Sequence, residues 1–147
     1  SGKPWLTQLY TRLICDEFYG ITPEHGYGYG QDEDQGQLGA WYVMAAMGLF
    51  DVQGGTNISP SYQIGSPKFR KITIKLDPRY YSGKTFVIET ENNAPNHYYV
   101  QSATLNGQLL EDCWFYRREI INGGHLKLQM NSTPNTRWGI SSTPHSK

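Results

Sequence analysis

The sequence feature that most restricts the fold is an unbroken apolar segment in the first third of the chain. Residues 37–50, QLGAWYVMAAMGLF, carry apolar side chains at nearly every position instead of along one stripe. A helix with this composition is typically buried on all sides. Since one further helix cannot surround it, we expect its other neighbours to be helices of a larger helical body outside this chain.

The other predicted helix comes first in the sequence. Residues 4–19 begin with Pro4 near the first turn, which favours a helix start, and Gly20 and Pro23 end the segment. Apolar side chains recur at spacings of three and four residues, as in an amphipathic helix; they are Leu6, Leu9, Leu13, Ile14 and Phe18.

The hydrophobic period changes after residue 58. Apolar and polar side chains alternate over 72–76 and 126–130, which predicts half-buried strands. Segments 85–91 and 97–105 are rich in aromatic and β-branched residues and are also predicted strands. Weaker strand predictions cover 62–65, 114–121 and 137–140.

A tight turn is predicted at Asn106-Gly107, between two apolar runs, because both residue types tolerate the positive φ of a hairpin turn. Two helices followed by about six to eight strands predict an α+β fold, in which an antiparallel β-sandwich follows the helices. We divide the chain accordingly into residues 1–55 and 56–147.

Charge and composition exclude several classes of partner. The 13 Lys and Arg residues balance 13 Asp and Glu residues, so the formal net charge is zero. A neutral chain has no sequence-independent attraction to a polyanion, which argues against nucleic acid as a partner. No run of about 18 apolar residues is present, so we expect no membrane insertion. Cys15 and Cys113 fit no metal-binding spacing, and we expect two free, buried thiols, with a long-range disulfide as the alternative.

The acidic loop before the apolar helix is the candidate functional segment. Asp32 and Asp34 are two residues apart in a glycine-flanked loop, where they can present two carboxylates to the same small volume. Close like charges raise the pKa of one carboxylate, which tunes such a pair for proton transfer. Carboxylate oxygens also suit calcium, although the spacing is not that of an EF-hand.

Each of these residues also has a structural interpretation. Asp34 and Gln37, three residues apart, match a capping box at the start of the helix. His25 can bind a substrate hydroxyl or a metal, but a single loop histidine is usually neither. Trp41 and Tyr42 can stack on a sugar, but on an all-apolar helix packing in a core is favoured.

Five segments in order resemble the C-terminal part of glycoside hydrolase family 92, the calcium-dependent α-mannosidases. The resemblance runs from Trp5 to Gly139. Its segments are GQDEDQGQLGAWYVMAAMGLFDV, SYQIGSPKFRKITIKLD, TFVIETENN, YYVQSATLNGQLL and PNTRWG.

The resemblance implies an exo-acting enzyme that removes mannose from α-mannosides such as those of N-glycans, with inversion at the anomeric carbon. It also implies an N-terminal β-sandwich and a C-terminal (α/α)6 barrel. On this map residues 1–55 contain the last helices and the active-site loop of the barrel, and residues 56–147 are a closing β region. The chain would pack on the N-terminal part of its own protein, and the location would be extracytoplasmic, in the periplasm, at the cell surface or secreted.

The resemblance also implies roles for individual residues. Asp32 and Asp34 match the two aspartates at the catalytic-base end of the family's site; we expect Asp34 to be the direct base or a calcium ligand, assisted by Asp32. We assign His25 and Gln37 to substrate binding. The family's general acid is a glutamate of an earlier barrel loop with no counterpart here, so the chain alone is expected to be inactive. Gly39 stands where many members have Ser, which weakens helix propensity near the site.

Two non-catalytic interpretations remain beside the enzymatic one. The strand-rich part is a free-standing carbohydrate-binding sandwich with a platform of tyrosines and tryptophans, or it is a purely structural closing domain. A buried apolar helix argues against the first, because a binding module rarely needs one.

Overall fold

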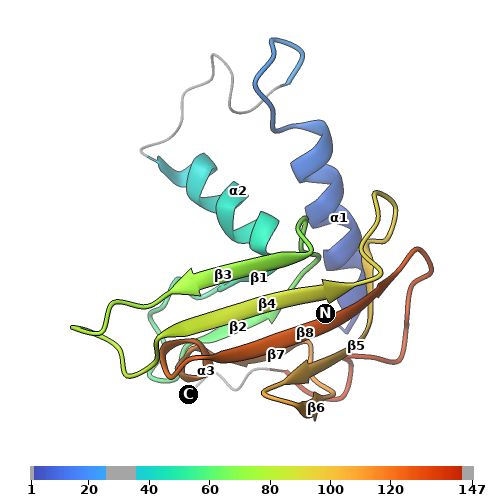
Figure 1. Ribbon diagram of the computed structural model, residues 1–147. Helices are drawn as coiled ribbons and strands as arrows, with labels where there is room; N and C mark the ends of the chain where they lie inside the picture. The colour runs from blue at the N-terminus through green and yellow to red at the C-terminus, as the bar shows by residue number, and fades with distance from the viewer. Residues whose placement is uncertain (1, 26–35, 144–147) are drawn as a thin grey trace.

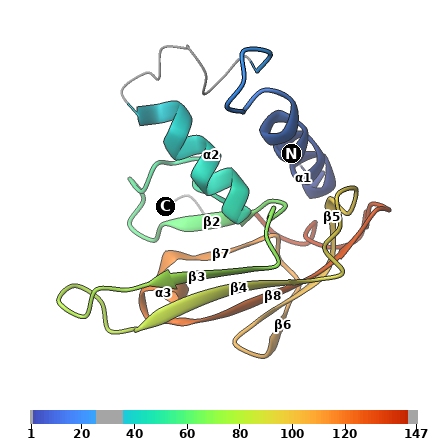
Figure 2. The same ribbon diagram turned by 45° about the horizontal axis from the view of Figure 1, so that its top comes forward.

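The computed structural model describes residues 2–25 and 36–143. Helices α1 and α2 come first and lie together on one side of the sheets (Figure 1). The three-stranded sheet lies between α2 and the five-stranded sheet (Figure 2). This arrangement confirms the predicted α+β fold class. The elements are α1 (Pro4–Glu17), α2 (Gln37–Met47), β1 (Leu49–Phe50), β2 (Ser61–Ile64), β3 (Lys71–Lys75), β4 (Thr85–Glu91), β5 (Tyr99–Leu105), β6 (Gln108–Leu110), β7 (Trp114–Tyr116), α3 (Arg117–Ile121) and β8 (Gly124–Asn131).

The strands pair in two sheets. Strands β1-β2-β7 form a small antiparallel sheet, and β3-β4-β8-β5-β6 form a larger one. Within the larger sheet β4 and β8 run parallel, while its other pairs are antiparallel. The parallel pair, which the sequence does not indicate, arises because the chain passes through β5, β6, β7 and α3 before it returns beside β4.

The predicted hairpin is confirmed at the junction of β5 and β6. Asn106 and Gly107 have φ values of 52° and 80°, as such a turn requires. The Asn106 side chain also accepts a hydrogen bond from the His125 N–H at 2.8 Å. This bond attaches the turn to the start of β8, so the hairpin and the central strand hold each other in register.

Several predicted boundaries change in the structure. The predicted strand over 114–121 is β7 followed by the short helix α3, and residues 137–140 form a turn instead of a strand. Helix α2 ends at Met47 instead of residue 50, because Gly48 adopts a left-handed conformation with φ of 75°. The chain then enters β1.

The hydrophobic core lies between the two sheets. Alternate residues of the larger sheet point inward and are fully buried, as the period of two requires. The rings of Phe86 on β4 and Phe115 on β7 are stacked, with centroids 5.8 Å apart, and join the two layers. The other core residues include Leu49, Ile64, Ile88, Val100, Ala103, Leu126, Leu128, Met130 and Trp138.

Helix α1 is attached to the sheets mainly by polar side chains. Gln8, Arg12 and Cys15 are its buried residues, whereas the leucines of the predicted apolar face are only partly buried. Gln8 Oε1 accepts a hydrogen bond from the Val100 N–H at 3.0 Å, where the register of β5 shifts against β8. Arg12 Nη1 donates to the Pro67 carbonyl at 2.7 Å. Two polar residues one turn apart therefore connect α1 to two separate segments of the β region.

Helix α2 is not buried on all sides within this chain. Only Ala45 and Ala46 of its residues are fully buried, and Val43 is 55% exposed. Within the described ranges, α1, the small sheet and residues 65–68 contact the helix, and the expectation that helices outside this chain complete its burial stays a prediction. Neither α2 nor any other helix in the described ranges is long and apolar enough to cross a membrane.

The two cysteines are free thiols, as expected. Cys15 is buried and Cys113 is partly buried. Burial raises the pKa of both thiols above the ordinary value, so both are protonated at neutral pH.

The substitution Gln8→Leu tests the attachment of α1. It keeps the approximate volume of the side chain but leaves the buried Val100 N–H without its acceptor, which costs about 1–3 kcal/mol. We expect this loss in the free energy of unfolding, measured by urea denaturation. Gln108→Leu on β6, where the glutamine is exposed, is the control and should change stability by less than about 0.5 kcal/mol. Equal effects of the two substitutions would contradict the proposed attachment.

Candidate functional site

The predicted catalytic residues Asp32 and Asp34 lie outside the described residues. The structure describes the chain on both sides of them, up to His25 and from Gly36. Two described segments flank the acidic residues in the sequence, one before them and one after them. We call these the loop stems: residues 16–25, at the end of α1, and residues 36–42, at the start of α2.

Both loop stems lie on the side of the helices away from the sheets. Helices α1 and α2 contact each other, and the C-terminal end of α1 and the N-terminal end of α2 point in this direction (Figures 1 and 2). The acidic sequence thus connects two helix ends whose positions are set by the packing of the helices.

Aromatic rings join the two loop stems. The Tyr19 ring stacks on Trp41, with centroids 5.4 Å apart and an interplanar angle of 16°. The same ring lies 5.1 Å from the Tyr42 ring. Trp41 and Tyr42 therefore pack against another part of the chain, in agreement with the packing interpretation of these residues.

His25 belongs to a local turn in the first stem. Its Nδ1 lies 2.8 Å from Thr22 Oγ1, and its N–H donates to the Thr22 carbonyl at 3.1 Å. The ring packs so closely on Gly20 that a Cβ at that position would lie 2.3 Å from His25 Cγ. Gly20 is thus required by the turn, and the role of His25 in substrate binding stays a prediction.

Gln37 is the first residue of α2 and is exposed. The N-cap is Gly36, with φ of 92°, and it has no side chain to cap the helix. The alternative of a capping box depends on Asp34, which lies outside the described residues. The role of Gln37 in substrate binding likewise stays a prediction.

A cluster of charged side chains joins the first stem and α1 to the segment after β2. Asp16 forms an ion pair with Lys68 and lies 3.9 Å from Arg12 Nε. Burial alone would lower the pKa of Lys68, but the hydrogen bond and charge of Asp16 outweigh burial and raise it. Sequence reasoning missed this pair, because its members are separated by 52 positions and belong to no motif.

Residues 65–68, which follow β2, connect the two helices. The Gly65 N–H donates to the Gly48 carbonyl at 2.8 Å, and the Lys68 N–H donates to the Ala46 carbonyl at 3.0 Å. Pro67 packs directly on Gly48, where a Cβ would lie 2.5 Å from Pro67 Cγ. Since the Pro67 carbonyl also accepts from α1, this short segment fixes the C-terminal end of α2 against α1.

A mainly apolar pocket of about 410 Å³ lies between the helices and the small sheet. Neither His25 nor Gln37 lines it. Its apolar lining includes Pro4, Trp41, Ala45, Leu49, Phe50, Val52, Ile64 and Ile140.

The described residues do not form a metal centre by themselves. Within residues 2–25 and 36–143, no three His, Cys, Asp or Glu side chains are placed to hold an ion. Calcium takes six to eight oxygen ligands. Asp34 has the right donor type but lies outside the described residues.

Comparison with known proteins identifies the class and the family. The sequence model described as the glycosyl hydrolase family 92 catalytic domain matches residues 1–132. This match places the chain in a family of glycoside hydrolases. The chain belongs to glycosyl hydrolase family 92, which includes mannosidases.

Solved structures and a curated relative agree with this family. The inverting mannosidase BT2199 of Bacteroides thetaiotaomicron is 39% identical, with a TM-score of 0.78, over 95% of this chain and 18% of that protein. The α-mannosidase BT3965 of the same organism is 29% identical, with a TM-score of 0.81, over 95% of this chain and 18% of that protein. A secreted glycosidase of Arthroderma benhamiae, described as uncharacterized, is 32% identical over 95% of this chain and 17% of its own length. The chain thus spans less than a fifth of these relatives.

Substitution of Gly48 tests the contact between α2 and residues 65–68. Gly48→Ala would strain a positive φ and also place a methyl group against Pro67. Gly54→Ala is a matched control, because Gly54 also has a positive φ but no atom lies within 4 Å of the position that a Cβ would occupy there. Thermal unfolding should show a loss of about 1 kcal/mol for the control. Gly48→Ala should lose about 1–3 kcal/mol more, the usual cost of overpacking. Similar losses in the two variants would show that Pro67 moves aside at little cost, which would contradict a tight contact between α2 and residues 65–68.

Proposed function

We propose that this chain is the part of an inverting exo-α-1,2-mannosidase that carries the catalytic base, and that its substrates are mannose-containing glycans such as N-glycans. The observation that carries this proposal is the family match over residues 1–132 together with the structural likeness to α-mannosidases. One of these relatives is described as inverting. The acidic loop, lying between two packed helix ends, supplies the carboxylates that the reaction requires.

The chemistry of inversion defines what the loop must do. A water molecule attacks the anomeric carbon as the bond to the leaving oxygen breaks. One carboxylate takes a proton from the water, and a carboxylic acid on the other side of the sugar gives a proton to the leaving oxygen. The two groups stand about 6.5–9.5 Å apart to leave room for the water.

Asp34 is the direct base in this proposal, and Asp32 assists it. Two carboxylates two residues apart repel each other, which raises the pKa of one and makes it a better proton acceptor. His25 and Gln37, on the two loop stems, contact the sugar. The general acid comes from outside this chain.

Calcium is the cofactor in this proposal, with Asp34 as one of its ligands and the remaining ligands outside the described residues. When bound, the ion would hold mannose hydroxyls and favour a distorted ring. The location is extracytoplasmic, which is supported by the relative described as secreted.

The remainder of the same protein covers the helices. Large apolar side chains on and after α1 and α2 are exposed, which is costly for a helix pair that faces water. The chain spans less than a fifth of the three relatives compared above, and we propose that the corresponding remainder of this protein covers these side chains. The exposed side chains are Tyr10, Phe18, Ile21 and Val43.

A carbohydrate-binding sandwich is less favoured by the side chains of the larger sheet. A sugar platform requires exposed aromatic rings, whereas the outward positions of β3, β4 and β8 are mainly charged or polar. They include Lys71, Thr73, Lys75, Glu89, Glu91, His125 and Lys127.

Substitution of the two aspartates in the full-length protein tests the proposal. Asp32→Asn and Asp34→Asn keep the shape of the side chains but remove the proton acceptor, so kcat on an α-1,2-mannobiose should fall by roughly 100- to 10,000-fold. Glu33→Gln, the residue between them, is the control and should retain most of the activity. Near-normal turnover in both aspartate variants would favour a purely structural role for this part of the protein.

The same variants test the calcium proposal without reference to turnover. Asp34→Asn should weaken calcium binding, measured by isothermal titration of the full-length protein, whereas Glu33→Gln should not. Unchanged affinity in Asp34→Asn would remove this residue from the ligand set.

The isolated chain should release no mannose from an α-mannobiose. Protonation of the leaving group is half of the chemistry, and the proposal places the acid outside this chain. The measurement is mannose release with and without added calcium. Calcium-dependent hydrolysis by the isolated chain would contradict this division of the site.

A further inference from the structure

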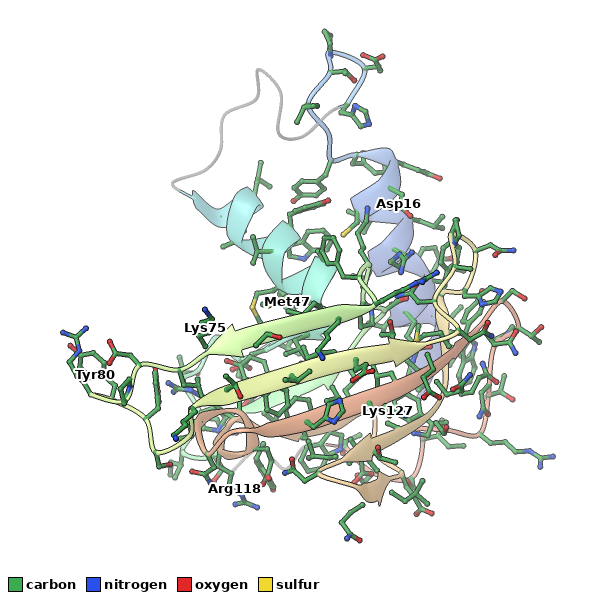
Figure 3. The ribbon with its side chains drawn as sticks, viewed as in Figure 1. Asp16, Met47, Lys75, Tyr80, Arg118 and Lys127 are labelled. Carbon is green, nitrogen blue, oxygen red and sulfur yellow. The ribbon has the colours of Figure 1, made fainter. Side chains whose placement is uncertain are left out.

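We propose that Lys68 is a positioning residue for the acidic loop, acting as a clamp that holds both loop stems. The clamp consists of Asp16 on the first stem, Tyr42 on the second stem, and Lys68 between them. Its effect on catalysis rests on the proposed function, but the clamp itself does not. Figure 3 shows Asp16 on the upper half of α1, toward the end from which the loop leaves.

The first contact of the clamp is the ion pair of Lys68 with Asp16. The two side chains are 22% and 36% exposed. Lys68 is partly buried while Asp16 is exposed, and a less exposed pair is screened less by water and salt. Lys127 and Glu91 on the larger sheet form a comparable pair, at 2.5 Å, but their side chains are 43% and 53% exposed. Lys68 is therefore the less exposed of the two lysines, and its pair is the less screened one.

The second contact is with α2. Lys68 Nζ lies 5.8 Å from the centroid of the Tyr42 ring, within the range of a cation–π interaction. Tyr42 in turn lies against Tyr19, which follows α1. One ammonium group therefore contacts a residue of each stem, and the rings connect the two stems directly.

The lysine can act in this way because its own backbone is fixed. Its N–H is bonded to Ala46 on α2, and the preceding Pro67 carbonyl accepts from Arg12 on α1. Asn93 Nδ2 also donates to the Pro67 carbonyl at 3.2 Å. The side chain thus projects from a segment that is attached to both helices and to the β region.

Positioning matters because a catalytic base must lie within hydrogen-bond reach of its water. A mutation far from the reacting atoms that displaces a catalytic group by about 1 Å can reduce the rate about 100-fold. Loss of the clamp should therefore lower kcat while leaving KM nearly unchanged.

The experiment compares Lys68→Met, Lys68→Arg and the control Lys127→Met in the full-length protein. The first readout is amide hydrogen exchange in the loop stems. Lys68→Met should accelerate exchange at residues 16–20 and 37–42 by roughly tenfold, Lys68→Arg should restore protection, and Lys127→Met should have no effect there.

The second readout is steady-state kinetics on an α-1,2-mannobiose. Lys68→Met should lower kcat by about 10- to 100-fold with little change in KM, and Lys68→Arg should recover most of the loss. Unchanged exchange in the stems would overturn the clamp. Faster exchange with unchanged kcat would overturn the positioning role. An inactive wild-type protein would instead overturn the proposed function, and exchange would still decide whether the clamp exists.

Discussion

The attachment of α1 to the β region by Gln8 and Arg12 is the interaction on which the rest of the structure depends. Both side chains are buried, and each satisfies a backbone group of a different β segment. A buried hydrogen bond to the backbone constrains position and orientation more strongly than an apolar contact, because it is lost with a small displacement. These hydrogen bonds fix the position of helix α1 along the sheet. Helix α2 packs against α1, so its position depends on the same bonds.

Residues 65–68 transmit this constraint to the second helix. They accept from Arg12, bond to the last turn of α2, and leave no space for a side chain at Gly48. The same four residues end with Lys68, whose side chain contacts Asp16 and Tyr42. A connection between two strands thus fixes the geometry of a helix pair, and with it the ends of the loop that carries the two aspartates.

Local sequence patterns predicted the elements of the fold but not their contacts. The alternation in β3 and β8 and the Asn106-Gly107 turn depend on neighbours in sequence, and these predictions were confirmed. The parallel pairing of β4 with β8 depends on the path of the chain between them, which no local pattern contains. In α1 the apolar spacing indicated that the leucine face would be buried, but Gln8 and Arg12 are more deeply buried. Their burial could not be predicted locally, because their hydrogen-bond partners lie 92 and 55 positions away in the sequence. The site divides in the same way: the acidic motif was visible in the sequence, while the pairing of Asp16 with Lys68 was not.

The distribution of contacts on the helices explains how this part of the protein can serve a larger site. Polar contacts fix the side of α1 that faces the sheet, since each requires a specific partner and geometry. Apolar side chains such as Val43 on α2 remain exposed and can be covered by many arrangements of neighbouring helices, because apolar packing is not directional. The loop stems of this helix pair are held by contacts within this chain. In the proposed enzyme, the base on the acidic loop would then meet the acid through the packing of the helices, without a direct connection between the two.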